Sequence, residues 1–342
     1  MKRLWILFGL LVLAACGSSV SDEVVAESNF VFEGKIGFVQ DNSTTFFGGD
    51  AHLSTYIQPQ NEIAVFLANG EIYRRTNFYG ANLVVADSES VSLVLADGER
   101  FDNIVGVIAD SPKIAVTQVY DDVLYHLQGG RRVLVVVFDG WGWEMHRHFA
   151  QVQPFLSTKV VDVAHTVFPP FTPVAMSSMF TGQLPNVHGV HDRATRTMAA
   201  PDIFQAATDL GFTSTRIQGG VAIVQTSQRP VLLPNLGDRY ETDQSVFDAA
   251  MARINDSDLT FVHFNAIDDA SHTYGPYAPE VAQSMALMDD LVRQLVAAHG
   301  GIAIITGDHG QHFLGEQDRM GDHLWVSHED MFVPYIIIRS GE

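Results

Sequence analysis

The chain has 342 residues, of which 46% are hydrophobic and 18% charged, a composition that excludes a disordered protein and allows a large buried core. Its 40 acidic residues against 20 Lys and Arg give a net charge of -20, which argues against a nucleic-acid partner because such surfaces need clustered basic side chains. An acidic protein can still bind phosphate, since bound divalent metal ions would reverse the local field.

The N-terminus is predicted to be an export signal. Lys2 and Arg3 precede an apolar run at residues 5–13, which is shorter than the roughly 20 residues of a membrane-spanning helix. A buried N-terminal helix is the alternative. The segment LAAC, ending at Cys16, resembles a bacterial lipobox. This resemblance implies a signal peptide at residues 1–15, lipid attachment to Cys16, and an exported protein anchored to the cell envelope at its periplasmic or extracellular face.

Residues 16–29 are expected to be a tether, and residues 30–128 a small β-rich region. Two hairpin signals occur there: Asn69-Gly70 and Asp97-Gly98 each lie between apolar stretches. Cys16 is the only cysteine, so a disulfide within the chain is impossible.

From residue 129 to 342, apolar runs alternate with helical patterns, which predicts an α/β sandwich with a mostly parallel central sheet. A helix is expected from Pro279 to the glycines at 300 and 301, because apolar residues recur there at intervals of three and four. Four strands are expected at residues 132–138, 260–264, 302–306 and 333–338.

Acidic residues and histidines follow three of these predicted strands. Asp139 ends the first strand, although an Asp at this position is often only a turn or cap residue. Asp268 and His272 follow the second strand and would share one helical face, where they could also simply hydrogen-bond to each other. Asp308 and His309 follow the third strand in a glycine-flanked loop. Ligands bind at this edge of α/β sheets, so carboxylates and imidazoles without thiolates predict a zinc site, with manganese as the alternative.

Thr172 precedes Pro173 and is expected to cap a helix N-terminus. The amides at a helix N-terminus can also hold a phosphate, and a hydroxyl bound there to a metal would ionise more easily. Thr172 is therefore either only a cap or also a nucleophile.

The order of these segments resembles the alkaline phosphatase superfamily, most closely its nucleotide pyrophosphatase/phosphodiesterase branch, over about residues 131–340. The likeness includes a strand ending in Asp139-Gly140, Thr172 nine residues before Thr181, the segment PNVHG at 185–189, and the sequence GDHG at 307–310.

The resemblance implies an alkaline-phosphatase-like fold for residues 129–342 and two divalent metal ions. One ion would be held by Asp268, His272 and His323, with His328 as the competitor of His323. The other would be held by Asp139, Asp308, His309 and the oxygen of Thr172.

The implied reaction is hydrolysis of phosphate mono- or diesters through a phosphothreonine at Thr172. Arg193 stands where the branch usually has an Asn. It would bind a doubly charged phosphoryl group and favour monoesters or phosphonates, unless it forms an ion pair with Asp192 or another acid.

Several alternatives stay open. They are a phosphonate hydrolase, a transferase of phosphoryl headgroups such as a phosphoethanolamine transferase, and a non-catalytic lipoprotein module on this fold. The segment DGWGWE is closer to cofactor-independent phosphoglycerate mutases, but their serine motif does not follow. Sulfatases are disfavoured because the chain lacks their CxPxR-like motif.

Overall fold

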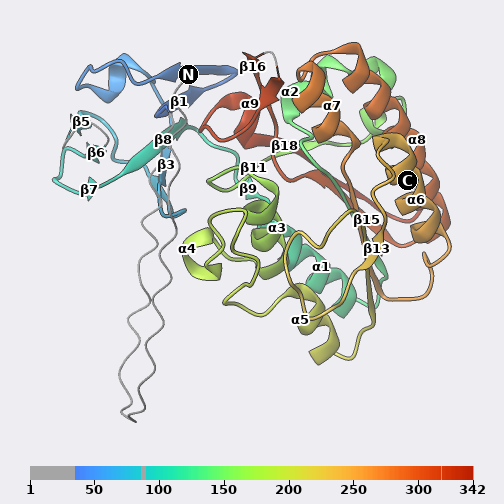
Figure 1. Ribbon diagram of the computed structural model, residues 1–342. Coiled ribbons are helices and arrows are strands. Elements are labelled where there is room, and N and C mark those ends of the chain that lie inside the picture. The colour runs from blue at the N-terminus through green and yellow to red at the C-terminus, as the bar shows by residue number, and fades with distance from the viewer. Residues whose placement is uncertain (1–34, 86–89, 317, 342) are drawn as a thin grey trace, which may run out of the picture. The chain divides into compact units, whose positions relative to one another are not determined.

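The computed structural model of the protein describes residues 35–85, 90–316 and 318–341 (Figure 1). The predicted signal peptide, Cys16 and the tether lie outside this part of the chain. None of the helices in the described ranges combines the length and apolarity needed to cross a bilayer.

An eight-stranded sheet forms the centre of the α/β part (Figure 1). In sheet order its strands are β13 (Val231–Leu233), β12 (Ser214–Gly219), β14 (Leu259–Phe264), β10 (Val133–Phe138), β15 (Ile302–Gly307), β18 (Phe332–Ile338), β11 (Asp162–His165) and β9 (Ile114–Ala115). Only β18 runs against the others, because both of its pairings are antiparallel. The predicted mostly parallel sheet is therefore confirmed.

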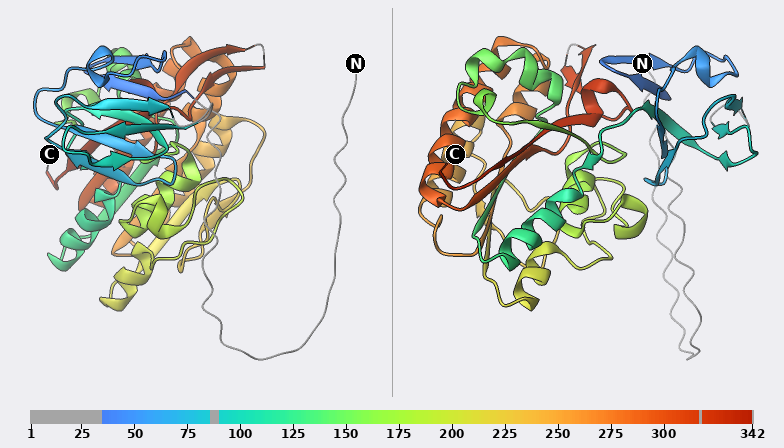
Figure 2. Two further views of the ribbon diagram at one scale, coloured as in Figure 1. Left: turned by 90° about the vertical axis from the view of Figure 1, so that its left-hand side faces the viewer. Right: turned by 180° about the vertical axis from the view of Figure 1, so that it is seen from behind.

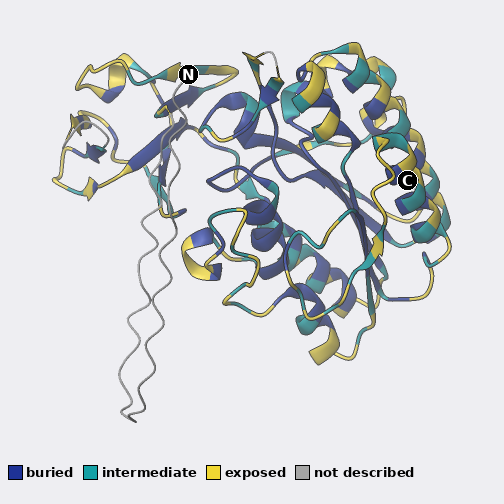
Figure 3. Cartoon of the chain, in the orientation of Figure 1, coloured by how far each residue is buried: buried dark blue, intermediate teal, exposed yellow. Residues whose placement is uncertain are grey.

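Helices cover both faces of this sheet, as Figures 1 and 2 show. One side carries α1 (Gln118–Gln128), α3 (Thr172–Thr181) and α5 (Ile203–Asp209), and the other carries α2 (Trp143–His148), α6 (Arg239–Met251), α7 (Ala266–Tyr274) and α8 (Pro279–His299). Alternate residues of β10 supply the two cores: Val135 packs with the first group and Val136 with the second. The unbroken apolar run of β10 follows from this burial on both faces (Figure 3).

The N-terminal strands form two smaller antiparallel-rich sheets around their own apolar core. One has the order β2 (Ser43–Phe46), β1 (Gly37–Gln40), β8 (Ile104–Ala109), β3 (Ile63–Leu67) and β4 (Ile72–Arg75), and the other has β5 (Asn82–Val85), β6 (Val91–Val94) and β7 (Arg100–Phe101). The predicted hairpins are present, since β3 pairs with β4 across Gly70 and β6 with β7 across Gly98.

Helix α1 differs from the expectation for residues 30–128. Its buried residues Val119, Val123 and Leu127 pack in the same core as β10, so this segment belongs to the α/β layers and not to the β-rich sheets. The sequence of a short amphipathic helix shows that one face is buried, but it does not show against which layer that face packs.

The remaining short elements lie in connections. They are η1 (Leu53–Thr55), η2 (Ala150–Val152), η3 (Leu156–Thr158), α4 (Pro185–His188), α9 (His328–Met331) and the hairpin of β16 (His312–Glu316) with β17 (Arg319–Asp322). The β16–β17 hairpin and the segment after it connect β15 to α9, and this connection carries His323.

Candidate functional site

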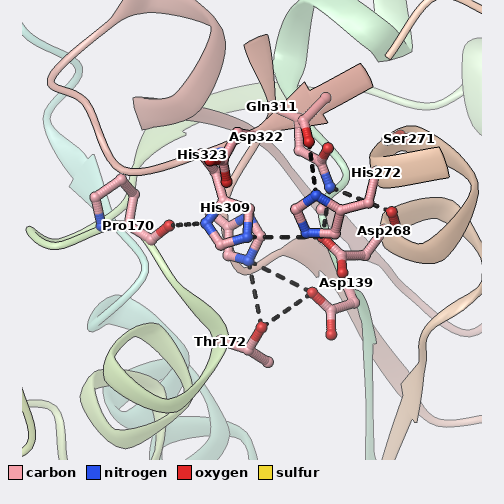
Figure 4. A network of polar contacts seen from close by, with 12 residues as sticks. Asp139, Pro170, Thr172, Asp268, Ser271, His272, His309, Gln311, Asp322 and His323 are labelled. Carbon is pink, nitrogen blue, oxygen red and sulfur yellow. Dashed lines mark hydrogen bonds and ion pairs between the residues drawn. The ribbon is translucent and has the colours of Figure 1, made fainter. Parts of the chain in front are cut away.

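Three neighbouring parallel strands bring the candidate residues to one edge of the sheet. Asp139 follows β10, Asp308 follows β15, and the segment after β14 leads into α7. The carboxyl ends of parallel strands meet at the same edge, which explains why residues far apart in the chain converge. We call the resulting group the cluster; its residues are Asp139, Thr172, Asp268, His272, Asp308, His309 and His323. Figure 4 labels all of them except Asp308.

One half of the cluster surrounds Thr172. Its hydroxyl donates a hydrogen bond to Oδ1 of Asp139 at 3.1 Å and lies 3.3 Å from Nε2 of His309. The same nitrogen lies 3.4 Å from Oδ1 of Asp139 and 3.5 Å from Oδ2 of Asp308. All four residues predicted for this half are therefore within reach of one point.

The other half is built from α7 and the segment after β17. Oδ1 of Asp268 lies 3.4 Å from Nε2 of His272, one helical turn further along α7, and 3.9 Å from Nε2 of His323. The ring of His323 also stacks on that of His309 at 3.9 Å between centroids, which joins the two halves.

The competing residue His328 points elsewhere. Its Nε2 is 2.7 Å from Oε1 of Glu144, and its backbone amide donates to Oγ1 of Thr44. The structure therefore brings His323 into the cluster and leaves His328 out of it.

The three histidines of the cluster share one orientation. In each ring, Nδ1 lies close to a backbone carbonyl oxygen. The distance is 3.1 Å from His309 to Gly310, 2.7 Å from His272 to Gly321, and 2.8 Å from His323 to Pro170. A carbonyl can only accept, so each Nδ1 carries a proton, and Nε2 is the ring nitrogen that faces the cluster and offers its lone pair when the ring is neutral. Metal-binding histidines are typically held in this way.

The spacing of the donor atoms also fits metal ions. Ligands about 2.0 to 2.1 Å from a tetrahedral zinc ion lie about 3.4 Å from each other, close to most of the separations above. Oδ2 of Asp308 is buried without a hydrogen-bond partner among the described residues. Carboxylates crowded together in a dry site are expensive unless a cation is bound, so the residues present fit the implied ions.

Electrostatics within the cluster agree with this crowding. Burial raises the pKa of Asp139 well above its usual range, and the neighbouring Asp308 and Asp268 raise it further. Burial by itself would lower the pKa of His309, but the carboxylates of Asp308 and Asp139 outweigh burial and raise this pKa to about 10. Burial, together with His309, holds the pKa of His323 well below its usual range. Three carboxylates, those of Asp139, Asp268 and Asp308, are therefore crowded together in a protein whose net charge is already -20, and bound cations would balance them.

Thr172 is not the helix cap that the sequence predicted. It is the first residue of α3, Phe171 is the N-cap, and no side-chain capping hydrogen bond forms. The Thr172 hydroxyl is instead turned toward the cluster (Figure 4). There it donates a hydrogen bond to the carboxylate of Asp139, and a hydrogen bond to a charged group is stronger than one between the hydroxyl and a neutral amide of its own helix.

Arg193 lies near Thr172 through its neighbour Phe171. The guanidinium carbon is 5.7 Å from the centre of the Phe171 ring, and the side chain is exposed. No ion pair joins Arg193 to a described residue, and Asp192 accepts hydrogen bonds from the amides of Ala194 and Thr195 instead. Arg193 is thus available to an anion beside the cluster.

Three polar residues beside the cluster escaped sequence analysis. Asn265 donates to Oδ2 of Asp139 at 3.2 Å, and Gln311 donates to Oδ1 of Asp268. His263, within β14, lies 3.5 Å from Oδ2 of Asp139. Asn265 follows a predicted strand, as Asp139 does, and could have been suspected. His263 and Gln311 carried no signal because contacts between distant segments alone reveal them.

A cavity of about 520 Å³ opens beside the cluster. Asn265 and His272 line both the cavity and the cluster. Arg239, at the start of α6, contributes a positive charge to the wall and is held over the ring of Tyr274 at 5.3 Å. Arg239 forms no ion pair with a described residue, although Asp269 also lines the cavity. The space is large enough for a substituent of a bound phosphoryl group.

The β-rich region contacts the segments that carry the cluster. The tip of the β3–β4 hairpin lies so close to Pro185 that a Cβ added to Gly70 would be 2.5 Å from the Cβ of Pro185 and 3.2 Å from the carbonyl of Phe168. Next to it, Glu71 accepts a hydrogen bond from Asn186. Phe168 precedes α3 by four residues, so the hairpin supports the approach to Thr172.

The sequence of the chain matches a known protein family. The sequence model described as type I phosphodiesterase/nucleotide pyrophosphatase matches residues 133–230 and 224–332, more than half of the chain. The catalytic subunit of GPI ethanolamine phosphate transferase 3 from Mus musculus is 24% identical over 86 residues, which are 24% of this chain and 8% of that protein. The Homo sapiens subunit is 31% identical over 61 residues, or 17% of this chain and 6% of that protein. The matches thus span less than a tenth of these relatives.

Two solved structures are similar to part of this chain. Phosphonoacetate hydrolase from Sinorhizobium meliloti 1021, in complex with phosphonoformate, aligns with a TM-score of 0.46 at 20% identity over 66% of this chain and 61% of that chain. Murine ectonucleotide pyrophosphatase/phosphodiesterase 5 aligns with a TM-score of 0.45 at 17% identity over 55% of this chain and 59% of that chain. The family assignment does not depend on these distant likenesses. On the extent of the sequence match, the chain belongs to the type I phosphodiesterase/nucleotide pyrophosphatase family.

Proposed function

We propose that the protein is a two-metal hydrolase of phosphate esters in which Thr172 attacks phosphorus. The proposal is carried by one observation: six ligand-type side chains gather in one cluster with Thr172, and Nε2 of each of the three histidines faces into it. Zinc is the expected ion because imidazoles and carboxylates are mixed, and manganese is the alternative. Such ions would neutralise the phosphoryl oxygens and lower the pKa of the Thr172 hydroxyl.

The residues of the chain then act in two steps. Oγ1 of Thr172, oriented by its hydrogen bond to Asp139, gives up its proton to solvent and forms a bond to phosphorus, while the bond from phosphorus to the leaving oxygen breaks and that oxygen takes a proton from solvent. Water next attacks the phosphothreonine, the bond between phosphorus and Oγ1 breaks, and the threonine hydroxyl is regenerated. In this proposal Arg193 binds an oxygen of the phosphoryl group and the cavity beside His272 receives the substituent; the support is the contact of Arg193 with Phe171, the neighbour of Thr172, and the presence of His272 in the cavity wall.

The test uses p-nitrophenyl phosphate and bis(p-nitrophenyl) phosphate as substrates for the purified full chain. We expect turnover that disappears with EDTA, returns with zinc or manganese, and falls by at least 10³-fold in Thr172→Ala. Thr208→Ala is the control, because Thr208 is an exposed residue of α5 whose hydroxyl donates to the carbonyl of Phe204 in its own helix. Full activity of the Thr172→Ala protein would exclude the proposal.

A second candidate is transfer of the phosphoryl group to an alcohol in place of water. The short sequence match to ethanolamine phosphate transferases motivates it, although that match covers less than a tenth of those proteins. Adding ethanolamine or glycerol during turnover separates the two reactions. With p-nitrophenyl phosphate as the substrate, hydrolysis predicts that the inorganic phosphate released equals the p-nitrophenol released, whereas transfer predicts a phosphorylated alcohol in place of the inorganic phosphate.

We also propose that the mature protein is lipidated at Cys16. The support is the LAAC segment after a basic and apolar start. Metabolic labelling with a fatty acid should mark the wild-type chain and leave Cys16→Ser unlabelled. Equal labelling of the two chains would contradict lipidation at this residue.

A further inference from the structure

His263 is a buried imidazole to which the proposed reaction gives no role. Its side chain is 0% exposed, and neither ring nitrogen makes a hydrogen bond to a described residue. A neutral imidazole carries one N–H donor and one lone pair, and burying both without partners is costly. A histidine is therefore a poor choice for this position unless something binds to it.

Two residues that lie close to Asp139 also have a polar atom without a partner among the described residues. Asn265 and Asp308 each have a buried oxygen without a hydrogen-bond partner, Oδ1 and Oδ2 respectively. One ring nitrogen of His263 and one oxygen each of Asp139 and Asp308 lie within 4.8 Å of one another. Two carboxylates and an imidazole lone pair offer mainly acceptors, and acceptors crowded together are satisfied by a cation.

The distances favour shared coordination over hydrogen bonding. Nε2 of His263 lies 3.5 Å from Oδ2 of Asp139, which is longer than the 2.7 to 3.2 Å of an N–H···O hydrogen bond. It is close to the separation of about 3.4 Å between two ligands of one tetrahedral zinc ion. His309 shows nearly the same separation, 3.4 Å, from the other oxygen of Asp139. Asp139 thus has an imidazole beside each carboxylate oxygen.

We propose that His263 is a further ligand of the ion expected at Asp139, Asp308 and His309. It would approach from the carboxylate oxygen of Asp139 that faces away from Thr172, because Oδ1 is the oxygen that accepts from the Thr172 hydroxyl. The inference rests on the proposed function only in requiring a metal ion in this half of the cluster. A set of two imidazoles and two carboxylates favours zinc over magnesium, which prefers oxygen ligands.

The test compares His263→Leu with His126→Leu in the full-length protein. His126 is a matched control because it is also a buried histidine with an unpaired Nδ1, but it lies on α1 and outside the cluster. Metal is removed with a chelator, and zinc affinity is measured by competition with a chromophoric chelator. Cobalt is then added to each protein, since its visible spectrum reports the number and type of ligands.

In His263→Leu, zinc binding should weaken while the stability of the metal-free protein does not fall. Zinc affinity at one of the two sites should fall at least 10-fold, with a changed cobalt spectrum, while the metal-free protein melts at the same or a higher temperature than wild type. A merely structural histidine would lower the melting temperature without changing the cobalt spectrum. In His126→Leu, both zinc affinities and the cobalt spectrum should match wild type.

Wild-type affinity at both sites and an unchanged cobalt spectrum in His263→Leu would overturn the inference. If this variant does not fold, His263→Gln replaces it, and the same cobalt result decides. Wild-type protein that binds two metal ions but hydrolyses no ester would refute the proposed function and leave the role of His263 standing. Wild-type protein that binds no metal would refute both.

Discussion

The hydroxyl of Thr172 lies 3.1 Å from the carboxylate of Asp139, although 33 residues separate them in the chain. Asp139 follows β10 and Thr172 begins α3, so the contact depends on the start of that helix lying at the carboxyl edge of the sheet. Two consequences follow for Thr172: its hydroxyl is oriented before a substrate binds, and its identity as a hydroxyl residue matters more than its methyl group.

Thr172→Ser should therefore keep a measurable part of the activity. We expect a loss of roughly tenfold in kcat/KM, about 1.4 kcal/mol in activation free energy, because the serine side chain has more rotational freedom. Acid quenching during turnover, followed by mass spectrometry, should find one phosphoryl group on the peptide that contains residue 172 in both proteins. A phosphoryl group on a different peptide would contradict the assignment of Thr172.

His323 and His328 provide a matched pair, since both are buried histidines in the segment after β17 and only His323 lies in the cluster. His323→Ala should lose at least 10²-fold in kcat and bind one metal ion less tightly. His328→Ala should lose about 1 to 3 kcal/mol of stability, because its bond to Glu144 is removed, and keep its metal content. Metal analysis and thermal unfolding of both proteins check this, and the reverse pattern would identify His328 as the ligand.

Arg239 should control how tightly substrates with an extended acidic substituent bind. Its guanidinium lines the cavity beside His272 and has no ion-pair partner in the described part of the chain. Arg239→Ala should raise KM about tenfold for such substrates, about 1.4 kcal/mol, and leave p-nitrophenyl phosphate nearly unchanged. Arg293→Ala is the control, because Arg293 pairs with Asp290 on the exposed face of α8. An equal change for all substrates would place Arg239 outside substrate recognition.

Substitutions at Gly70 and Gly98 can separate the cost of backbone strain in a hairpin from the cost of disturbing a contact with the α/β layers. Both have positive φ angles, +83° and +90°, and only Gly70 faces atoms of the α/β layers. Gly98→Ala should cost about 1 to 2 kcal/mol through backbone strain alone. Gly70→Ala should cost more and also lower kcat/KM, because an added Cβ would press on Pro185 and on the carbonyl of Phe168. Thermal unfolding and kinetics of the pair test this, and equal effects would show that the hairpin does not support the site.

Asp243 should make stability depend on pH. Burial raises the pKa of Asp243 to about 7, although its carboxylate accepts hydrogen bonds from the amides of Asn265 and Ala266. A folded-state pKa above the unfolded value of about 3.9 means that the folded state binds the extra proton. This contribution is fully present below about pH 4 and is lost as the pH rises through about 7.

Asp243→Asn should remove that dependence. Between pH 4 and 8 the unfolding free energy of wild type should fall relative to the variant by about 1 to 4 kcal/mol, measured in urea on metal-free protein. Asp248→Asn, an exposed acid on the same helix, is the control. Parallel pH profiles for wild type and Asp243→Asn would show that the amides of α7 hold the carboxylate ionised in the folded protein.

The sequence alone determined the fold class, the four strands that it marked, and the positions of the predicted ligands. The reason is physical: strands buried on both faces read as unbroken apolar runs, and in a parallel sheet whatever follows such runs must meet at one edge. Asp139, Asp268 and Asp308 could be found for this reason. The same reasoning found His272 from helical spacing and His309 from its glycine-flanked loop.

Only the tertiary structure decided between residues whose local sequence was equally suitable. It turned the hydroxyl of Thr172 away from its own helix, brought His323 rather than His328 to Asp268, and packed α1 into the α/β layers. It also revealed His263, which sits inside an apolar strand where local sequence predicts only packing. Such outcomes depend on which segments meet across the sheet, and contacts between segments distant in the chain leave no period or spacing in the sequence that one could read.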